Sequence, residues 1–352
     1  MSLPTTLTAW QMDAPGVPLT RHELPMPSPG PDEVLIQVAG CGLCHTDLSF
    51  LHGGVKTKKE LPLTLGHEFT GTVIAAGEAF TNLIGRDVLV PAVLPCGSCA
   101  LCRAGRPTAC RGQVMPGNDV NGGFATHAVV PARSLCPVDA GSFALWELGV
   151  VADAVTTPYQ AMERAGVVAG DTVVVIGVGG IGTYGVQIGA ARGATVIAVD
   201  VDSQKLERIR DFGARGTVNA AGLDSRGVKD AVRSSARELG CPPTAWKVFE
   251  MSGTGAGQAV AYDLLTFGGT VGFIGFTMDK STIRLGNLMA FDATVFGNWG
   301  CSPELYPAAL DLVLSGKIQI RPFIRRFPLD DINQVIAEAQ AHRLGERPVL
   351  VP

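Results

Sequence analysis

The segment DTVVVIGVGGIGTYG, residues 171–185, joins a run of apolar, β-branched residues to a glycine-rich turn and a helix-length stretch. Gly177, Gly179 and Gly182 fit the pattern G-x-G-x-x-G. In that pattern the first glycine makes a tight turn, the second lets the backbone approach a pyrophosphate, and the third lets the helix pack closely on the strand. The chain contains 44 glycines, so the segment alone also fits an ordinary turn in an α/β sheet.

The next strand-like run, residues 195–200, supports a dinucleotide site. It ends in Asp200, close to the expected distance of about 20 residues from the glycine motif. A carboxylate at this point accepts hydrogen bonds from the adenosine ribose and repels a 2′-phosphate. The sequence therefore predicts binding of NAD rather than NADP, with the loop residues Gly180 and Ile181 also beside the cofactor and the pyrophosphate at the helix N-terminus.

Strand-like and helix-like segments alternate on both sides of this motif. From about residue 155 the apolar runs are 171–180, 193–200, 246–253 and 268–276, and the clearest helical segments between them are 181–193 and 203–213. Such alternation predicts a parallel sheet covered by helices on both faces. The runs before residue 150 (32–40, 71–77, 85–93 and 125–132) are short and separated by glycine and proline, which predicts an all-β, barrel-like domain. Two further helices are expected within 303–317 and 329–345.

Composition limits the function classes. The 352 residues are 46% hydrophobic and 17% charged, with a net charge of −4, which gives no general attraction to nucleic acid or to anionic lipid. Neither an export signal nor an apolar run of membrane-spanning length is visible. Nine cysteines in such a chain suggest reduced thiols, whose clusters more often bind metal than form disulfides. We therefore expect a soluble cytoplasmic protein.

The segment CGSCALCRAGRPTAC, residues 96–110, carries four closely spaced cysteines: Cys96, Cys99, Cys102 and Cys110. Four thiolates can surround one tetrahedral zinc ion and leave no position for a substrate. The sequence therefore predicts a structural zinc lobe at about residues 95–112. Two disulfides or an iron–sulfur cluster are the alternatives.

Two other segments suggest an open metal site. AGCGLCHTDLS (39–49) offers Cys44, and LPLTLGHEFTG (61–71) offers His67, which Glu68 follows. A zinc ion with three protein ligands and one free position would make a bound alcohol acidic, as it does bound water. Residue reasoning leaves the third ligand open among the remaining Cys, His, Asp and Glu residues.

These segments together, in this order, resemble the zinc-dependent medium-chain alcohol dehydrogenases along nearly the whole chain. The resemblance implies a GroES-like β-barrel catalytic domain (1–154), a Rossmann NAD-binding domain (155–297) and a return to the first domain (298–352). It also implies that Cys44 and His67 bind the catalytic zinc, with Glu68 close to it. Asp47 would orient the histidine, Thr46 would take the substrate proton, and His45 would lie beside the pyrophosphate.

Two departures from the family pattern matter. Asp153 stands where many members have a cysteine as third zinc ligand. Its oxygen suits zinc, although a helix-capping role is the alternative. Ser49 stands where many members have the histidine that passes the relayed proton to water. Because serine cannot store a proton near neutral pH, His52 is a candidate substitute, and a surface or packing role is the alternative for it.

The resemblance also assigns further cofactor contacts. It places Lys205 near the adenosine ribose, Arg347 at the pyrophosphate, and the backbone from Ile274 to Phe276 against the nicotinamide. Either Lys205 or Arg347 could instead be a solvated surface charge. The single cysteines Cys41, Cys136, Cys241 and Cys301 are interpreted as buried or incidental thiols.

The substrate is the least determined feature. Lys56, Lys58 and Lys59 precede His67, and a phosphorylated group such as coenzyme A would gain from these cations. Arg103, Arg106 and Arg111 are further candidates, and ordinary surface charge is the alternative for all six. With residues 42–50 and 297–307, the lysine segment resembles dehydrogenases of 6-hydroxycyclohex-1-ene-1-carbonyl-CoA in anaerobic benzoyl-CoA degradation.

Three hypotheses follow. The first is oxidation of a secondary alcohol carried by CoA, and the second is oxidation of free aromatic, cyclic or polyol alcohols. The third is an NAD-binding sensor that a structural zinc ion stabilises and that has no catalytic activity. We expect a homo-oligomer, a tetramer rather than a dimer, and no nucleic-acid or membrane partner.

Overall fold

The computed structural model describes residues 4–352, and their contacts divide into two compact units. The first extends to Thr156 and includes Gly300–Leu314 and Ile320–Pro352, while the second comprises Thr157–Trp299 and Ser315–Gln319. The predicted limits, after residues 154 and 297, fall within two residues of this division. The segment Ser315–Gln319 belongs to the second unit, although the prediction placed it in the returning part of the first.

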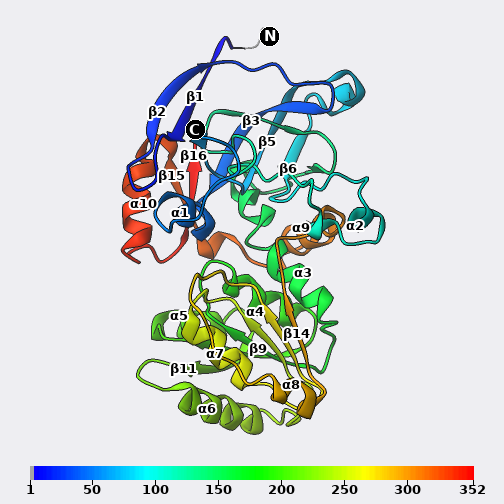
Figure 1. Ribbon diagram of the computed structural model, residues 1–352, viewed down its shortest axis with the longest axis vertical. Helices are drawn as coiled ribbons and strands as arrows, with labels where there is room; N and C mark the ends of the chain where they lie inside the picture. The colour runs from blue at the N-terminus through cyan, green and yellow to red at the C-terminus, as the bar shows by residue number, and fades with distance from the viewer. Residues whose placement is uncertain (1–3) are drawn as a thin grey trace. The chain divides into compact units, whose positions relative to one another are not determined.

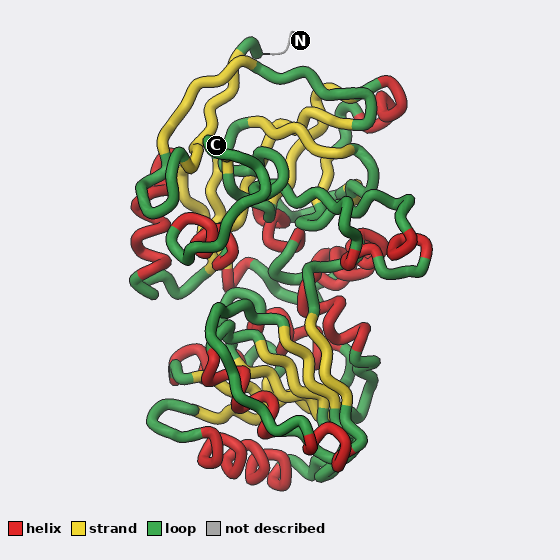
Figure 2. Tube along the Cα trace, in the orientation of Figure 1, coloured by secondary structure: helices red, strands yellow, loops and turns green. Residues whose placement is uncertain are grey.

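The second unit contains a six-stranded sheet in the order β11-β10-β9-β12-β13-β14. The strands are β9 (Thr172–Ile176), β10 (Thr195–Asp200), β11 (Ala214–Asn219), β12 (Lys247–Glu250), β13 (Thr270–Phe273) and β14 (Thr294–Gly297). Every neighbouring pair is parallel, and the strands lie side by side (Figure 2). The predicted parallel sheet is confirmed.

One helix precedes the first of these strands, and five others connect each strand to the next in the sequence. They are α3 (Thr156–Arg164), α4 (Gly182–Ala191), α5 (Ser203–Arg210), α6 (Ser225–Glu238), α7 (Gly255–Asp263) and α8 (Gly286–Phe291). Alternate residues of β9 and β10, such as Val174 and Ile197, share one buried cluster with Val228 and Val232 of α6. All five residues of β9 are buried. This continuous burial explains why the strand reads as an unbroken apolar run, as expected for a strand covered on both faces.

The first unit is built mainly from β-strands. Its seven-stranded sheet has the order β15-β16-β3-β5-β6-β8, with β7 also paired to β3, and a smaller sheet has the order β2-β1-β4. The strands are β1 (Thr6–Met12), β2 (Thr20–Pro25), β3 (Glu33–Gly42), β4 (Leu63–Thr64), β5 (Phe69–Ala76), β6 (Asp87–Val90), β7 (His127–Pro131), β8 (Cys136–Pro137), β15 (Ile324–Pro328) and β16 (Arg347–Val351).

Its α-helices are α1 (His45–Leu51), α2 (Ala100–Arg103), α9 (Tyr306–Leu314) and α10 (Ile332–Gln340). Six 3₁₀ helices complete the described elements: η1 (Glu78–Leu83), η2 (Pro107–Ala109), η3 (Leu145–Ala152), η4 (Pro303–Leu305), η5 (Arg321–Phe323) and η6 (Leu329–Asp331). No helix in the described part of the chain is long and apolar enough to cross a membrane.

The C-terminal segment returns to the first unit. Strand β16 pairs antiparallel with β3, through Val349 opposite Gly42 and Leu350 opposite Cys41 (Figure 1). Ile332 and Val335 of α10 lie in the same buried cluster as Ile36 of β3. This return brings Arg347, the first residue of β16, to the region of the predicted zinc ligands.

Candidate metal centres and cofactor loop

Three of the predicted ligands meet in the first unit. The Sγ atom of Cys44 lies 3.6 Å from Asp153 Oδ2, and His67 Nε2 lies 3.7 Å from the same oxygen. Their three ligand atoms all lie within 4.8 Å of one another. Cys44 precedes α1, His67 precedes β5, and Asp153 follows η3, so three separate elements supply the donors.

Asp47 holds two of these ligands in place. Its Oδ2 accepts a hydrogen bond from the Cys44 amide at 2.9 Å, which caps the first turn of α1. Its Oδ1 accepts from the Gly66 amide at 3.1 Å and lies 3.3 Å from His67 Nδ1. Because Nδ1 faces Asp47, Nε2 is left to face Cys44 and Asp153. A carboxylate in this position fixes the orientation of a metal-binding imidazole.

The negatively charged groups around His67 favour a bound cation. Burial lowers the pKa of its imidazole, but Asp47, Cys44 and Asp153 outweigh burial and raise the pKa well above its usual value. A sulfur, an imidazole nitrogen and a carboxylate oxygen match the donor types and the number of protein ligands found in catalytic zinc sites. We conclude that Cys44, His67 and Asp153 can hold zinc and leave one position for a substrate.

Glu68 forms a buried pair with Arg347. Its Oε2 accepts from Arg347 Nε at 2.7 Å and its Oε1 accepts from the Ala154 amide at 2.8 Å, so both oxygens are engaged. Burial raises the pKa of Glu68 to about 7, against the lowering effect of Arg347. Gly42 makes room for the pair, since a Cβ there would lie 1.9 Å from Glu68 Oε2. Arg347 is only 7% exposed, so its interpretation as a solvated surface charge is wrong.

The predicted proton-relay residues lie on α1. Thr46 Oγ1 is 3.6 Å from Cys44 Sγ, which places this hydroxyl beside the metal ligands. The Ser49 hydroxyl donates to the His45 carbonyl at 2.9 Å, and the exposed His52 ends the helix. Partial burial, together with the neighbouring charges of His342 and Arg347, lowers the pKa of His45.

The four-cysteine lobe forms a second cluster. Its sulfurs approach one another at 3.5 Å (Cys99 to Cys102), 3.7 Å (Cys99 to Cys110) and 4.0 Å (Cys96 to Cys102). All nine cysteines are free thiols in the structure. Hydrogen bonds from the backbone and hydroxyl of Ser98 lower the pKa of Cys96 to about 6, which favours a thiolate. Four sulfurs in this arrangement suit a structural zinc ion.

The glycine-rich turn in the second unit follows the expected division of roles. Gly177 has a φ of +84°, and a Cβ there would lie 2.5 Å from Ser252 Cα. A Cβ at Gly182 would lie 1.7 Å from the Gly177 carbonyl oxygen, so the helix can start only with glycine. At Gly179 no atom lies within 4 Å of such a Cβ, which leaves open space beside the N-terminal end of α4. A pyrophosphate can occupy that space.

Asp200 is tied to this turn. Its Oδ2 accepts from the Val178 amide at 2.6 Å and its Oδ1 accepts from the Asp202 amide at 3.0 Å. Asp202 in turn caps α5 by accepting from the amides of Gln204 and Lys205. The Lys205 amine lies 3.9 Å from Asp202, and the lysine side chain is 43% exposed.

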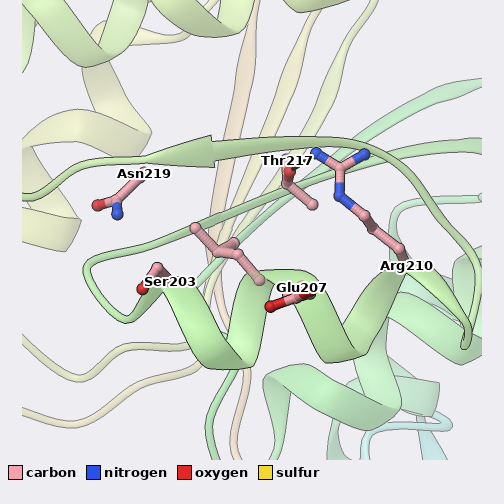
Figure 3. A pocket seen from close by; sticks show the side chains of 6 residues that line it. Ser203, Glu207, Arg210, Thr217 and Asn219 are labelled. Atoms are coloured by element: carbon pink, nitrogen blue, oxygen red, sulfur yellow. Dashed lines mark hydrogen bonds between the residues drawn. The ribbon is translucent and has the colours of Figure 1, made fainter.

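A recess of about 250 Å³ lies between α5 and β11 (Figure 3). It is lined by Ser203, Leu206, Glu207, Arg210, Thr217 and Asn219. The Arg210 guanidinium donates to the Thr217 hydroxyl. None of the predicted site residues lines this recess.

The predicted CoA-binding lysines are partly engaged. Lys58 forms an ion pair with Asp119 at 2.8 Å while remaining 58% exposed, and Lys59 Nζ donates to the Pro62 carbonyl at 3.2 Å. Lys56 is exposed.

Comparisons with known proteins give relatives along nearly the whole chain. A model of the alcohol dehydrogenase GroES-like domain matches residues 30–140, and one of zinc-binding dehydrogenases matches residues 180–315. An alcohol dehydrogenase of Geobacillus stearothermophilus is 29% identical over 90% of this chain and 91% of its own length. A D-arabinose 1-dehydrogenase (NADP(+)) of Saccharolobus solfataricus is 30% identical over 95% of both. A cobalt- and zinc-bound alcohol dehydrogenase of Pyrobaculum aerophilum superposes with a TM-score of 0.85 at 26% identity, covering 99% of this chain and 100% of its own. The predicted GroES-like and Rossmann folds are confirmed.

Proposed function

The chain belongs to the zinc-dependent medium-chain alcohol dehydrogenase family, and on that basis we propose that it oxidises a secondary alcohol by hydride transfer to NAD⁺ at Cys44, His67 and Asp153. The observation that carries this proposal is the convergence of these three donors within 4.8 Å, oriented by Asp47. Two zinc ions per chain belong to the same proposal, one at this centre and one in the four-cysteine lobe.

The residues around the centre have distinct tasks. Zinc supplies a Lewis acid that lowers the pKa of a bound alcohol. The Thr46 hydroxyl, 3.6 Å from Cys44 Sγ, would accept the alcohol proton and release its own proton to the nicotinamide ribose, and bound NAD⁺ would supply the hydride acceptor. The backbone hydrogen bond of Ser49 occupies its only proton, so this hydroxyl would have to rotate before it could extend a relay.

We expect replacement of Asp200 by glycine to change the cofactor preference. The variant should lower kcat/KM for NAD⁺ by about 10- to 100-fold, because hydrogen bonds to a charged group contribute about 1.5–3 kcal/mol. It should also raise kcat/KM for NADP⁺, because a negative charge facing the 2′-phosphate is removed. Steady-state kinetics with both cofactors measure the two changes.

Asp200→Asn is the matched control, because it removes the charge and keeps one side-chain oxygen that can accept from the Val178 or the Asp202 amide. If the asparagine variant gains NADP⁺ activity, the preference for NAD⁺ over NADP⁺ is due to the charge of Asp200. Unchanged NADP⁺ activity in both variants would contradict the proposed NAD preference.

The finer proposal for the substrate is a cyclic alcohol carried by CoA, namely 6-hydroxycyclohex-1-ene-1-carbonyl-CoA. It is supported by the exposed Lys56 and Lys58 on the loop that leads to His67. Free alcohols or polyols are the second candidate. The ion pair of Lys58 with Asp119 favours that candidate, because it already satisfies one of the cations.

Kinetics with matched substrates will separate the two. If CoA is recognised, the wild-type enzyme should have a kcat/KM about 10- to 100-fold lower for the free alcohol than for the CoA thioester. The double variant Lys56→Ala, Lys58→Ala should lose a similar factor in kcat/KM when the thioester is the substrate. Lys317→Ala, which removes an exposed lysine of the second unit, is the control and should have no effect. Equal kcat/KM for the thioester and the free alcohol would exclude the CoA proposal.

The same proposal includes a homotetramer in the cytoplasm. It is supported by the exposed edge strand β14 and by the apolar side chains near it, with Leu285 66% and Met289 81% exposed. A parallel sheet with an uncovered apolar edge can pair with a second copy. The nine free thiols fit a reducing compartment.

Light scattering should therefore give the mass of four chains for the wild type. A Leu285→Asp, Met289→Asp variant should give a smaller species, because two charges would be buried in the contact. A monomeric wild type would contradict the proposed assembly.

A further inference from the structure

One buried carboxyl group in the second unit has no part in the chemistry described above. Glu250, the last residue of β12, is 0% exposed. Strand β9 has β10 on one side and β12 on the other, so the strand order reverses beside Glu250. Dinucleotides bind across such a point at the carboxyl ends of the strands. Asp200 assigns the adenosine to the β10 side, which leaves the nicotinamide half to the side of β12 and β13.

The Glu250 side chain organises the loop that follows it. Its Oε1 accepts from the Ser252 amide at 2.7 Å, from the Gly253 amide at 3.1 Å and from the Ser252 hydroxyl. The Ser252 hydroxyl also lies 2.9 Å from the hydroxyl of Thr254, which caps α7. One carboxylate oxygen thus fixes residues 252–254.

The main chain of Glu250 holds the neighbouring loop. Its carbonyl oxygen accepts from the amides of Ile274 at 2.9 Å and Gly275 at 3.0 Å. Its Oε2 is buried without a hydrogen-bond partner, and a Cβ at Gly275 would lie 2.7 Å from that oxygen. Burial raises the pKa of this carboxyl group. The Glu250 side chain therefore lies close to the backbone of the second loop, residues 274–276.

The two loops touch each other and the glycine-rich turn. A Cβ at Gly275 would lie 2.3 Å from the Gly253 amide nitrogen, and a Cβ at Gly253 would lie 2.9 Å from the Phe276 carbonyl oxygen. A Cβ at Gly177, in the glycine-rich turn, would lie 2.5 Å from Ser252 Cα. Such close contacts leave the loops little freedom to move independently, so a change at Glu250 must be transmitted to both.

We infer that Glu250 is a positioning residue for the nicotinamide half of the cofactor, because it fixes loops 252–254 and 274–276 at the point where the strand order reverses. The inference rests on the NAD-binding part of the proposed function. It assigns to Glu250 no contact with the substrate or with a metal.

Two ligands that differ only in the nicotinamide separate this role from general stability. We would titrate the full-length wild type and Glu250→Leu with NADH and with ADP-ribose. The leucine variant removes the acceptor for three donors, so the Kd for NADH should rise by about 10- to 100-fold. The Kd for ADP-ribose should change by less than about 3-fold, because the Asp200 side of the sheet is untouched. Glu250→Gln keeps the Oε1 acceptor and should restore most of the NADH affinity.

Val248→Ala is the matched control for destabilisation, because Val248 is a buried residue of the same strand whose side chain belongs to the hydrophobic cluster with Val174 and Ile197. It should leave the ratio of the two Kd values unchanged. Should Glu250→Leu fail to fold, Ser252→Ala removes one donor to Glu250 and should still shift that ratio by about 3- to 10-fold.

The outcomes are distinguishable. Equal weakening of both ligands, or no weakening of NADH in any variant, would overturn the role of Glu250. If the wild type bound neither ligand, the proposed NAD-dependent function would fail and the inference with it.

Discussion

Replacement of Asp153 by alanine is expected to remove the catalytic zinc and to lower kcat/KM by more than about 100-fold. Loss of a group that merely orients a ligand already costs about 10- to 100-fold in metal affinity or activity, and Asp153 would be a ligand itself. Its Oδ2 lies within 3.7 Å of both Cys44 Sγ and His67 Nε2, so no other described side chain can take its place without movement. Zinc content and steady-state kinetics on the same preparation measure the two effects.

Two comparisons make this result specific. The zinc content should fall from two ions per chain to one, because the four-cysteine lobe is a separate cluster. Asp153→Cys should keep both ions, since thiolate is a common zinc ligand. An alanine variant with unchanged zinc content and turnover would exclude Asp153 as a zinc ligand and favour the helix-capping role, the alternative that the sequence left open.

Most of the architecture was predictable because it depends on local patterns. The buried residues of β9 make an apolar run, and the requirements at Gly177 and Gly182 are met by glycine alone. Helix ends were less predictable. The expected helix within 303–317 is α9, Tyr306–Leu314, preceded by the short η4, and Gly316 with a φ of +75° follows its end.

The metal ligands were predictable in a different way. Spacing within one segment indicated the four-cysteine lobe, but Cys44, His67 and Asp153 come from three distant segments, and only the family resemblance joined the third ligand to the others. The structure brings the three together.

Contacts between distant charged residues could not be predicted. The sequence shows Glu68 and Arg347 separately, and nothing local indicates that β16 returns to β3 and pairs them. The sequence likewise did not indicate that Lys58 pairs with the distant Asp119, so Lys58 was interpreted as a cation available to a substrate. Glu250 gave no signal, because an acidic residue at a strand end is ordinary until its burial is known.

The Glu68–Arg347 pair gives the second large expected effect. Arg347→Met should lower the free energy of unfolding by about 3–5 kcal/mol, the usual cost of leaving one charge of a buried pair without its partner. Methionine fills a similar volume, so the loss reports the unpaired carboxylate rather than a cavity. Chemical denaturation of the zinc-loaded protein measures the change.

The pH dependence identifies the group responsible. Burial already raises the pKa of Glu68 to about 7, and Arg347 opposes that rise, so its removal should raise the pKa further. A carboxyl group whose pKa is higher in the folded state stabilises the fold at low pH, and this contribution is lost as the pH rises through the folded pKa. The Arg347→Met variant should therefore be closer to the wild type at about pH 6 than at about pH 8.

The double variant Glu68→Gln, Arg347→Met completes the test. It removes both charges, and it should recover most of the stability lost in Arg347→Met, because the cost comes from one unpaired charge and not from loss of the pair as such. Glu68→Gln alone should also destabilise, since it leaves the buried guanidinium of Arg347 without its carboxylate. Additive losses in the double variant would mean that the two residues act independently, despite the 2.7 Å contact between them.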